Sequence, residues 1–172
     1  MKTTHIIVTL TVLLFSVSSN YAQTPKQPPK AQDAPVAGGP KDVTIEATII
    51  SMTNAEALQF SAERDLSGKA ADALKAMKHL VAEKKALSVA NLAVTTTAGG
   101  GGQARSGTIT VKFTPMVSPD GKVADITSSV TIADHRFDTH FVASNGAVKF
   151  IGSVQSPTDK TMTEFVFARV SY

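Results

Sequence analysis

The chain of 172 residues has no cysteine, no tryptophan and only two tyrosines. The absence of cysteine excludes disulfide bonds, a thiolate zinc site, a cysteine nucleophile and a lipid-modified N-terminal cysteine. Few large aromatic side chains argue against a surface that stacks on sugars or bases. Charged residues make up 18% of the chain, below the soluble average of about 25%. Together with 42% hydrophobic residues, this still excludes a wholly disordered chain.

An apolar run near the N-terminus has the layout of a secretory signal peptide. Lys2 and His5 precede the apolar residues 6–15, and small and polar residues follow up to Ala22. A membrane-spanning helix needs about 20 apolar residues, roughly twice the length of this run, so the pattern favours a cleaved signal over an anchor. We therefore predict a signal peptide over residues 1–22 and export of the remainder.

Residues 23–42 hold five of the eight prolines of the chain. Such a stretch cannot bury enough apolar surface to offset the entropy lost on ordering, so we predict a disordered linker here and one folded domain over residues 43–172. Loss of the signal peptide removes Lys2, one of the 17 basic residues, so that the remaining basic residues nearly balance the 14 acidic residues. This nearly even balance gives no indication of nucleic-acid binding.

Two hydrophobic periods are visible in the first part of the predicted domain. Apolar and polar residues alternate over residues 43–49, as in a half-buried strand. Over residues 70–81 the apolar residues follow a spacing of three and four, which indicates an amphipathic helix with its lysines in solvent. Asn54 is a candidate cap for a shorter helical turn that runs to Ala62.

Strand patterns return after Leu87 and continue to the end of the chain. We predict strands over residues 88–97, 108–113, 124–132, 148–154 and 161–172. Both faces of the last segment are apolar, which indicates a strand that is buried on two sides or lies in the centre of a sheet. The fold class is therefore α+β: a mainly antiparallel β-sheet of about six strands with one main amphipathic helix on one face.

Turn signals separate these strands. Proline and glycine in Pro119-Asp120-Gly121 favour a tight turn, and Asn145-Gly146 is the strongest short hairpin signal of the chain. Residues 157–159 indicate a further turn before the last strand. The parity of the apolar residues shifts across residues 133–136, which predicts a bend, bulge or loop there.

The segment 134–140 contains two of the three histidines that follow the signal peptide. Asp138 and His140 would share a face if the segment were a strand, whereas His135 would point the other way. Two or three such ligands without further support fall short of the three or four that a dedicated metal site needs. We therefore interpret the segment as a polar surface loop and predict no metal site.

Residues 99–107 begin with four consecutive glycines. They lack the Gly-Lys-Ser/Thr ending of a nucleotide-binding loop, and no helical pattern follows them, so a flexible connection between strands is the better interpretation. The sequence also contains no recognisable nucleophile, metalloprotease or paired-carboxylate motif. We predict no catalytic residues, no cofactor and no enzymatic activity.

The order of these segments resembles the core of the bacterial secretins, the ring-forming outer-membrane channels of type II and type III secretion and of type IV pili. The closest match is Gly107 and the alternating residues up to Pro115, followed by Ser118-Pro-Asp-Gly-Lys-Val123. The other matching segments are residues 43–50, 73–80, 86–96, 102–107, 145–152 and 165–170. The resemblance covers roughly residues 43–172 and rests on the order of its motifs.

The resemblance implies a reduced, gate-poor version of the secretin core. Residues 51–68 are too few for the gate strands of the family, and Ala90-Asn91 stands where the family carries a proline. It implies a non-catalytic structural or interaction module in the periplasm or at the outer membrane of a Gram-negative bacterium, associated with secretion or pilus machinery. Its partners would be proteins, or copies of itself, that pair through sheet edges, with no nucleic acid.

Two alternatives remain open at this stage. The first is a monomeric periplasmic binding or adaptor domain without a channel role, which would show a concave pocket between sheet and helix. The second is a metal protein or enzyme built on His135, Asp138 and His140.

Overall fold

The computed structural model of the protein describes residues 41–172. The predicted signal peptide, residues 1–22, and residues 23–40 of the predicted linker lie outside this range. The first strand begins at Asp42, one residue before the predicted start of the domain. The described elements are β1 (Asp42–Thr53), α1 (Asn54–Glu63), α2 (Ala70–Ala82), β2 (Leu87–Thr97), β3 (Gly102–Ser106), β4 (Ile109–Val117), β5 (Val123–Ile132), β6 (His135–Ser144), β7 (Val148–Gln155) and β8 (Met162–Ser171).

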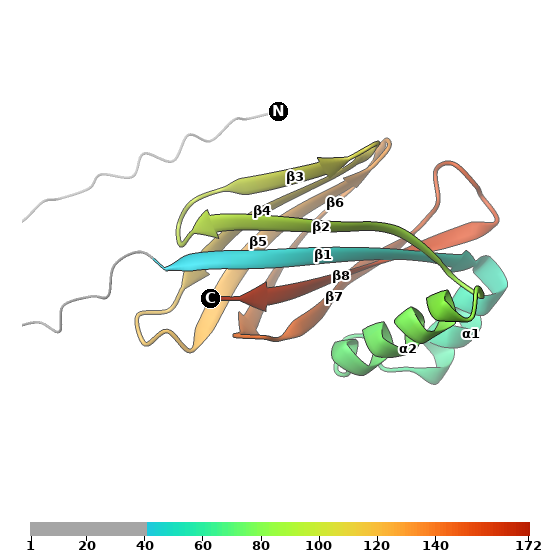
Figure 1. The fold of residues 1–172 in the computed structure, drawn as a ribbon, viewed down its shortest axis with the longest axis horizontal. Coiled ribbons are helices and arrows are strands. Elements are labelled where there is room, and N and C mark those ends of the chain that lie inside the picture. The colour runs from blue at the N-terminus through green and yellow to red at the C-terminus, as the bar shows by residue number, and fades with distance from the viewer. Residues whose placement is uncertain (1–40) are drawn as a thin grey trace, which may run out of the picture. The chain divides into compact units, whose positions relative to one another are not determined.

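The strands form two antiparallel sheets that pack face to face (Figure 1). The first sheet has the order β2-β1-β8-β7 and the second has the order β3-β4-β5-β6. The predicted α+β class with mainly antiparallel strands is confirmed, whereas one sheet of about six strands was wrong. The described residues form eight strands in two sheets, because β3 and β6 lie in segments whose glycines and charges had suggested loops.

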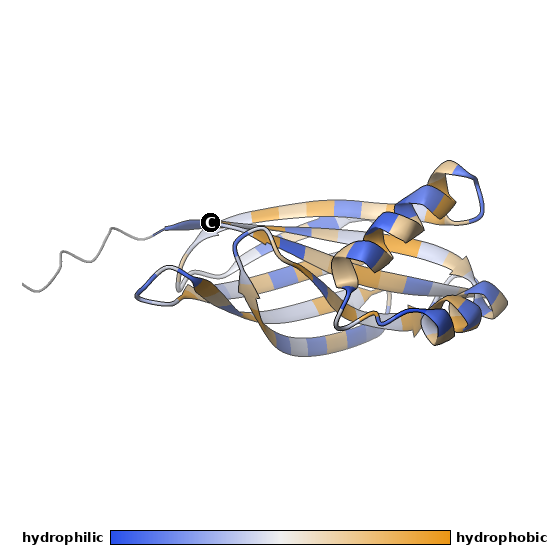
Figure 2. Ribbon diagram, turned by 90° about the horizontal axis from the view of Figure 1, so that it is seen from below, coloured by the Kyte–Doolittle hydropathy of each residue, from blue (hydrophilic) through white to orange (hydrophobic). Residues whose placement is uncertain are grey.

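A hydrophobic core fills the space between the sheets. Each strand contributes alternate residues to it, which is why the sequence pattern has period two (Figure 2). The largest fully buried side chains here include Ile45 and Ile49 of β1, Phe113 of β4 and Ile126 of β5. This core accounts for the strong alternation of the central strands, since a slip of one residue would place every apolar side chain in solvent.

The first sheet also carries a second core, on the face turned away from the second sheet. Phe165 and Phe167 of β8 face this second core, whereas Val166 and Ala168 face the core between the sheets. The prediction that the last strand is central and buried on both faces is therefore confirmed. Both helices pack over this second core at one end of the sheet (Figure 1).

β1 is longer than the predicted strand because it continues beyond a bulge into the second core. Ile49 is opposite Ala90 and Ile50 is opposite Ser88, so Val89 is an extra residue on β2. Beyond the bulge Ile50 and Met52 pack against the helices. Because residues 49–52 are all buried, the alternation of apolar and polar residues stops after Ile49, and the predicted strand was therefore too short.

The helices differ in how their first turns are stabilised. The cap of α1 is Thr53, one residue before the predicted cap Asn54, and it forms a capping box with Glu56, with two N–H to side-chain oxygen distances of 3.3 Å. The α2 helix matches its predicted range, and its apolar stripe includes Leu74 and Met77. Neither helix of the described part is long and apolar enough to span a membrane.

The turn signals have different outcomes. Pro119-Asp120-Gly121 forms the predicted tight turn between β4 and β5, with Gly121 at a φ of 66°. Asn145-Gly146 does not form a hairpin, because β6 belongs to the second sheet and β7 to the first. The Asn145 side chain instead hydrogen-bonds the main chain of Tyr172, with its Nδ2 2.7 Å from the carbonyl oxygen, and so secures the crossing between the sheets.

Candidate functional site

The segment predicted as a polar loop with His135, Asp138 and His140 is mostly the edge strand β6, so the loop prediction was wrong. Its half-buried Phe137 and Phe141 alternate with exposed polar residues, but charged side chains hid this period in the sequence. The predicted bend nearby is the turn of the β5–β6 hairpin, where Ala133 has a φ of 53°.

Asp138 and His140 share the outward face of β6, as the alternation predicted, but they contact different partners. The His140 ring contacts the Asp125 carboxylate on β5. Hydrogen bonds from Ser129 and from Arg136 lower the pKa of Asp138, and the Arg136 Nη2 lies 3.0 Å from its Oδ1. Among residues 41–172 no group of three or more histidine, aspartate or glutamate side chains is placed to hold a metal ion.

The glycine run connects the two sheets. It leads from β2 in the first sheet to β3 in the second, and Gly99 has a φ of 84°, which a larger residue would adopt only with strain. A Cβ atom on Gly102 would clash with the side chain of Val94. The run therefore serves the fold, as a connection that needs small residues, and part of it belongs to β3.

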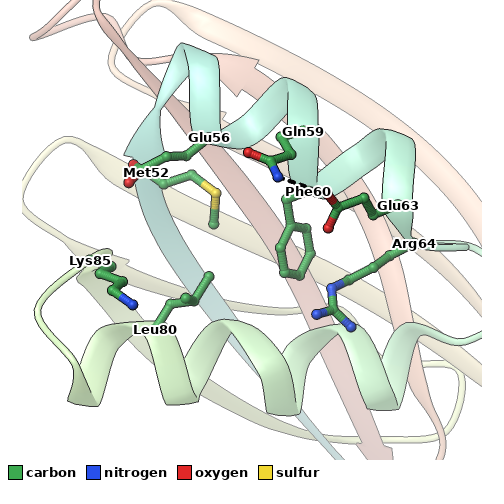
Figure 3. A pocket seen from close by; sticks show the side chains of 8 residues that line it. All are labelled: Met52, Glu56, Gln59, Phe60, Glu63, Arg64, Leu80 and Lys85. Carbon is green, nitrogen blue, oxygen red and sulfur yellow. Dashed lines mark hydrogen bonds between the residues drawn. The ribbon is translucent and has the colours of Figure 1, made fainter.

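A cleft of about 320 Å³ opens between α1 and α2 (Figure 3). Its apolar side chains are Met52, Phe60 and Leu80, and the Arg64 guanidinium lies 4.9 Å from the centre of the Phe60 ring. The remaining lining residues are polar or charged: Glu56, Gln59, Glu63 and Lys85. The cleft thus combines an apolar floor with charges of both signs at its rim.

An ion pair fixes the end of α2 beside this cleft. The Lys85 ammonium lies 2.9 Å from the Glu83 carboxylate. The hydrogen bond from Lys85 lowers the pKa of Glu83 and, reciprocally, raises the pKa of Lys85. Both groups are exposed, so this pair organises the rim of the cleft rather than stabilising the fold substantially.

The four edge strands of the described domain differ in how well they are protected against pairing with another strand. An edge strand exposes unpaired backbone groups, and proteins usually protect it by short length, charged side chains or a bulge. The strand β3 has 5 residues and includes Arg105, and β6 carries several charges. The strand β7 has Lys149 and an extra residue at Ile151. The strand β2 has 11 residues and contains neither charge nor proline.

The strand β2 also carries exposed apolar side chains near its start. Leu87 is 59% exposed and Val89, the bulged residue, is 41% exposed. From Ala90 to Thr97 the strand is regular and pairs with β1 on one side. Its inner residues Leu92 and Val94 belong to the core between the sheets. The run Ala90–Thr97, which we call the β2 edge, is uncharged. Its outer side chains Asn91, Ala93 and Thr95 are exposed, whereas Val94 lies against Gly102 of β3.

The strand β2 was predictable from the sequence, but its place at a sheet edge was not. The pattern over residues 88–97 predicted β-structure, and lack of charge was visible in the sequence. Only the strand order shows that β2 lies at the edge of the first sheet and is hydrogen-bonded to β1 alone. Comparison of the chain with protein-family models, with curated proteins and with solved structures finds no match.

Proposed function

We propose that the protein is an exported, non-catalytic interaction module that binds an extended protein segment by strand addition at the β2 edge. The observation that carries the proposal is the contrast in charge between the edges: β2 has 11 residues and no charged side chain, whereas β3, β6 and β7 each carry charged side chains. Exposed backbone groups of an unprotected edge pair readily with an incoming strand.

Strand addition at this edge would use both the backbone and the side chains. Each new backbone hydrogen bond contributes about 0.5–1.5 kcal/mol net. Since Leu92 and Val94 already face the core between the sheets, an apolar side chain of the incoming strand would continue that core. On the outer face it would lie beside Asn91, Ala93 and Thr95, which are exposed and uncharged.

The cellular setting of the proposal comes from the sequence. The signal-peptide pattern of residues 1–22 supports export, and the resemblance to the secretin core supports a place in the periplasm or at the outer membrane. The partner would then be a protein of an envelope secretion or pilus assembly. The finer fold assignment, a reduced secretin core, belongs to the same proposal.

Site-specific crosslinking in cells tests the proposed function. A photoreactive residue replaces Ala93 on the β2 edge, and the matched control carries it at Val142, which is exposed on the edge strand β6. We expect adducts with a second polypeptide from position 93 and none of the same adducts from position 142. No adduct from position 93, or identical adducts from both positions, would overturn the proposal.

The cleft between α1 and α2 favours a second candidate, a monomeric binding or adaptor domain. It is a concave site walled by two helices and by Met52 of β1, as that alternative required. Native mass spectrometry of protein purified under mild conditions tests it. A bound small molecule that is lost in the cleft-filling variant Leu80→Trp would support this function, and a ligand-free spectrum of the wild type would count against it.

A further inference from the structure

We infer that Asn145 is a site of spontaneous deamidation, which the folded domain holds back for as long as the end of β8 stays paired. Asn145-Gly146 is the one asparagine–glycine pair of the chain. Asparagine is a thermolabile residue, and the glycine that follows it has no side chain to hinder an attack by its own amide nitrogen. Both residues are exposed, so water reaches this connection between β6 and β7. The site is separate from the β2 edge and does not depend on strand addition there.

The reaction is an attack of the main chain on the neighbouring side chain. A solvent base takes the proton of the Gly146 N–H, and the freed nitrogen forms a bond with Cγ of Asn145. The bond between Cγ and Nδ2 breaks, and Nδ2 takes a proton from water and leaves as ammonia, so a cyclic succinimide remains. Water then opens the ring at either of its carbonyl carbons, which gives aspartate or isoaspartate at position 145. Water is the only co-reactant, and the loss of ammonia to the solvent makes the change permanent.

The fold holds both reacting groups in hydrogen bonds. The Gly146 N–H donates to the carbonyl oxygen of Val170 at 2.7 Å, which retains the proton that has to leave. Nδ2 of Asn145 donates to the carbonyl oxygen of Tyr172 at 2.7 Å, and its Oδ1 accepts from the Tyr172 N–H at 3.1 Å. Attack needs a free nitrogen and a side chain that can turn towards it. These hydrogen bonds must therefore open before the ring can close.

The partners of both reacting groups lie together at the end of β8, in residues 170–172. The earlier part of β8 is held between β1 and β7 and buries Phe165 and Phe167. The end of a strand opens locally at a lower free energy than a strand centre that is buried in the core. One local opening of residues 170–172 thus releases the whole reacting pair while the rest of the domain remains folded.

The product cannot rebuild the contact with the end of β8. An ionised carboxylate only accepts hydrogen bonds, so position 145 no longer has a donor for the Tyr172 carbonyl oxygen. The carboxylate and that carbonyl oxygen are then two acceptors at the place of one donor–acceptor pair. Isoaspartate also adds a carbon atom to the main chain of the turn. The modification therefore loosens the crossing between the two sheets, and the loosened state persists.

Peptide mapping by mass spectrometry of the full chain measures the reaction. The purified protein is kept in mildly alkaline buffer, with and without a denaturing concentration of urea. We expect position 145 to be converted at least roughly tenfold more slowly in the folded protein, because tenfold corresponds to about 1.4 kcal/mol, which one or two hydrogen bonds supply. Asn91, which precedes Leu92, is the internal control and should stay asparagine in both samples. Equal rates at position 145 in both samples, or no conversion in urea, would overturn the inference.

Two variants test the role of the β8 end. Tyr172→Ala removes a ring that packs against the core between the sheets, so conversion at position 145 should be several-fold faster in native buffer and unchanged in urea. The matched control Met116→Ala, at an exposed side chain of β4, should change neither rate. Asn145→Asp reproduces one product and should speed amide exchange at residues 170–172 but not in α2. Unchanged conversion in Tyr172→Ala, or unchanged exchange in Asn145→Asp, would show that the β8 end does not control the site. Circular dichroism confirms that each variant is folded.

Discussion

Glu164 is a buried acidic residue near the start of β8, just before the apolar run 165–168. It is 4% exposed, and its Oε2 is shielded from solvent without a hydrogen-bond partner among the described residues. Its neighbours across the sheet are Ser51 on β1 and Val154 on β7. We predict that replacement of Glu164 by leucine stabilises the domain, because a buried polar atom without a partner costs free energy relative to water.

The magnitude follows from that cost. An unsatisfied buried polar group costs about 1–3 kcal/mol, and leucine has a similar reach and would lie opposite Val154. We therefore expect Glu164→Leu to raise the free energy of unfolding by about 1–3 kcal/mol. For a domain of this size the midpoint of thermal unfolding should rise by about 3–15 °C. Glu164→Gln should gain less, since its amide also needs partners.

Urea unfolding at neutral pH measures the effect on the full chain. The midpoint should rise while the slope of the transition stays constant, since the compactness of the native state is unchanged. The control is Glu46→Leu on β1 of the same sheet, where the side chain is exposed and the change should stay within about 0.5 kcal/mol. If Glu164→Leu is less stable than wild type, the carboxylate has a partner, such as a buried water, and the reasoning is refuted.

Three further predictions concern turns and caps. Thr53→Ala removes the side-chain acceptor of the α1 capping box and should lower stability by about 1 kcal/mol in thermal unfolding. Asn145→Ala removes two hydrogen bonds to the main chain of Tyr172 and should lower it by about 1–3 kcal/mol, with increased amide exchange at the C-terminus. The Ser118 hydroxyl lowers the pKa of Asp120 below its ordinary value of 3.8. The ionised Asp120 carboxylate therefore stabilises the folded state at pH values above 3.8, and this stabilisation is lost as the pH falls through the folded pKa. Asp120→Asn should be less stable than wild type at pH 7, and the difference should shrink in unfolding experiments as the pH falls through the folded pKa of Asp120. An equal difference at neutral and acid pH would contradict this assignment.

The elements with a strong and uninterrupted period were predictable. The α2 helix, the half-buried strands and the doubly buried β8 all have patterns that follow from burial on one face or on two. Prediction failed for parts of β1 and β6, where the alternation of apolar and polar residues is interrupted. β1 changes its buried face after Ile49, and in β6 the charges of Arg136 and Asp138 hid the alternation of Phe137 and Phe141.

Asn145-Gly146 shows why local signals do not determine sheet partners. The dipeptide does form a turn, with Gly146 at a φ of 76°. A hairpin also needs the two flanking strands to pair with each other, and here β6 pairs with β5 in the second sheet while β7 pairs with β8 in the first. The turn therefore joins two layers, and the Asn145 side chain supplies bonds that a hairpin would have made within the backbone.

The candidate site was partly visible in the sequence. The absence of charge over residues 88–97 and the small residues around Ala93 could be seen without coordinates. The α1–α2 cleft could not, because its lining residues are separated by the α1–α2 connection and meet only when both helices pack on Phe165 and Phe167. Likewise, nothing in the sequence places Glu164 opposite Ser51.

The sequence by itself determined the local geometry where one period is uninterrupted: the α2 helix, the strands with clear alternation and the tight turn at residues 119–121. These properties depend on side chains near one another in the chain, and periodicity records them directly. Tertiary structure alone decided that the strands divide into two sheets and that β2 lies at the edge of the first sheet. Sheet order depends on pairings between residues far apart, whose free energies are similar for many alternatives, and only packing of the whole core selects among them.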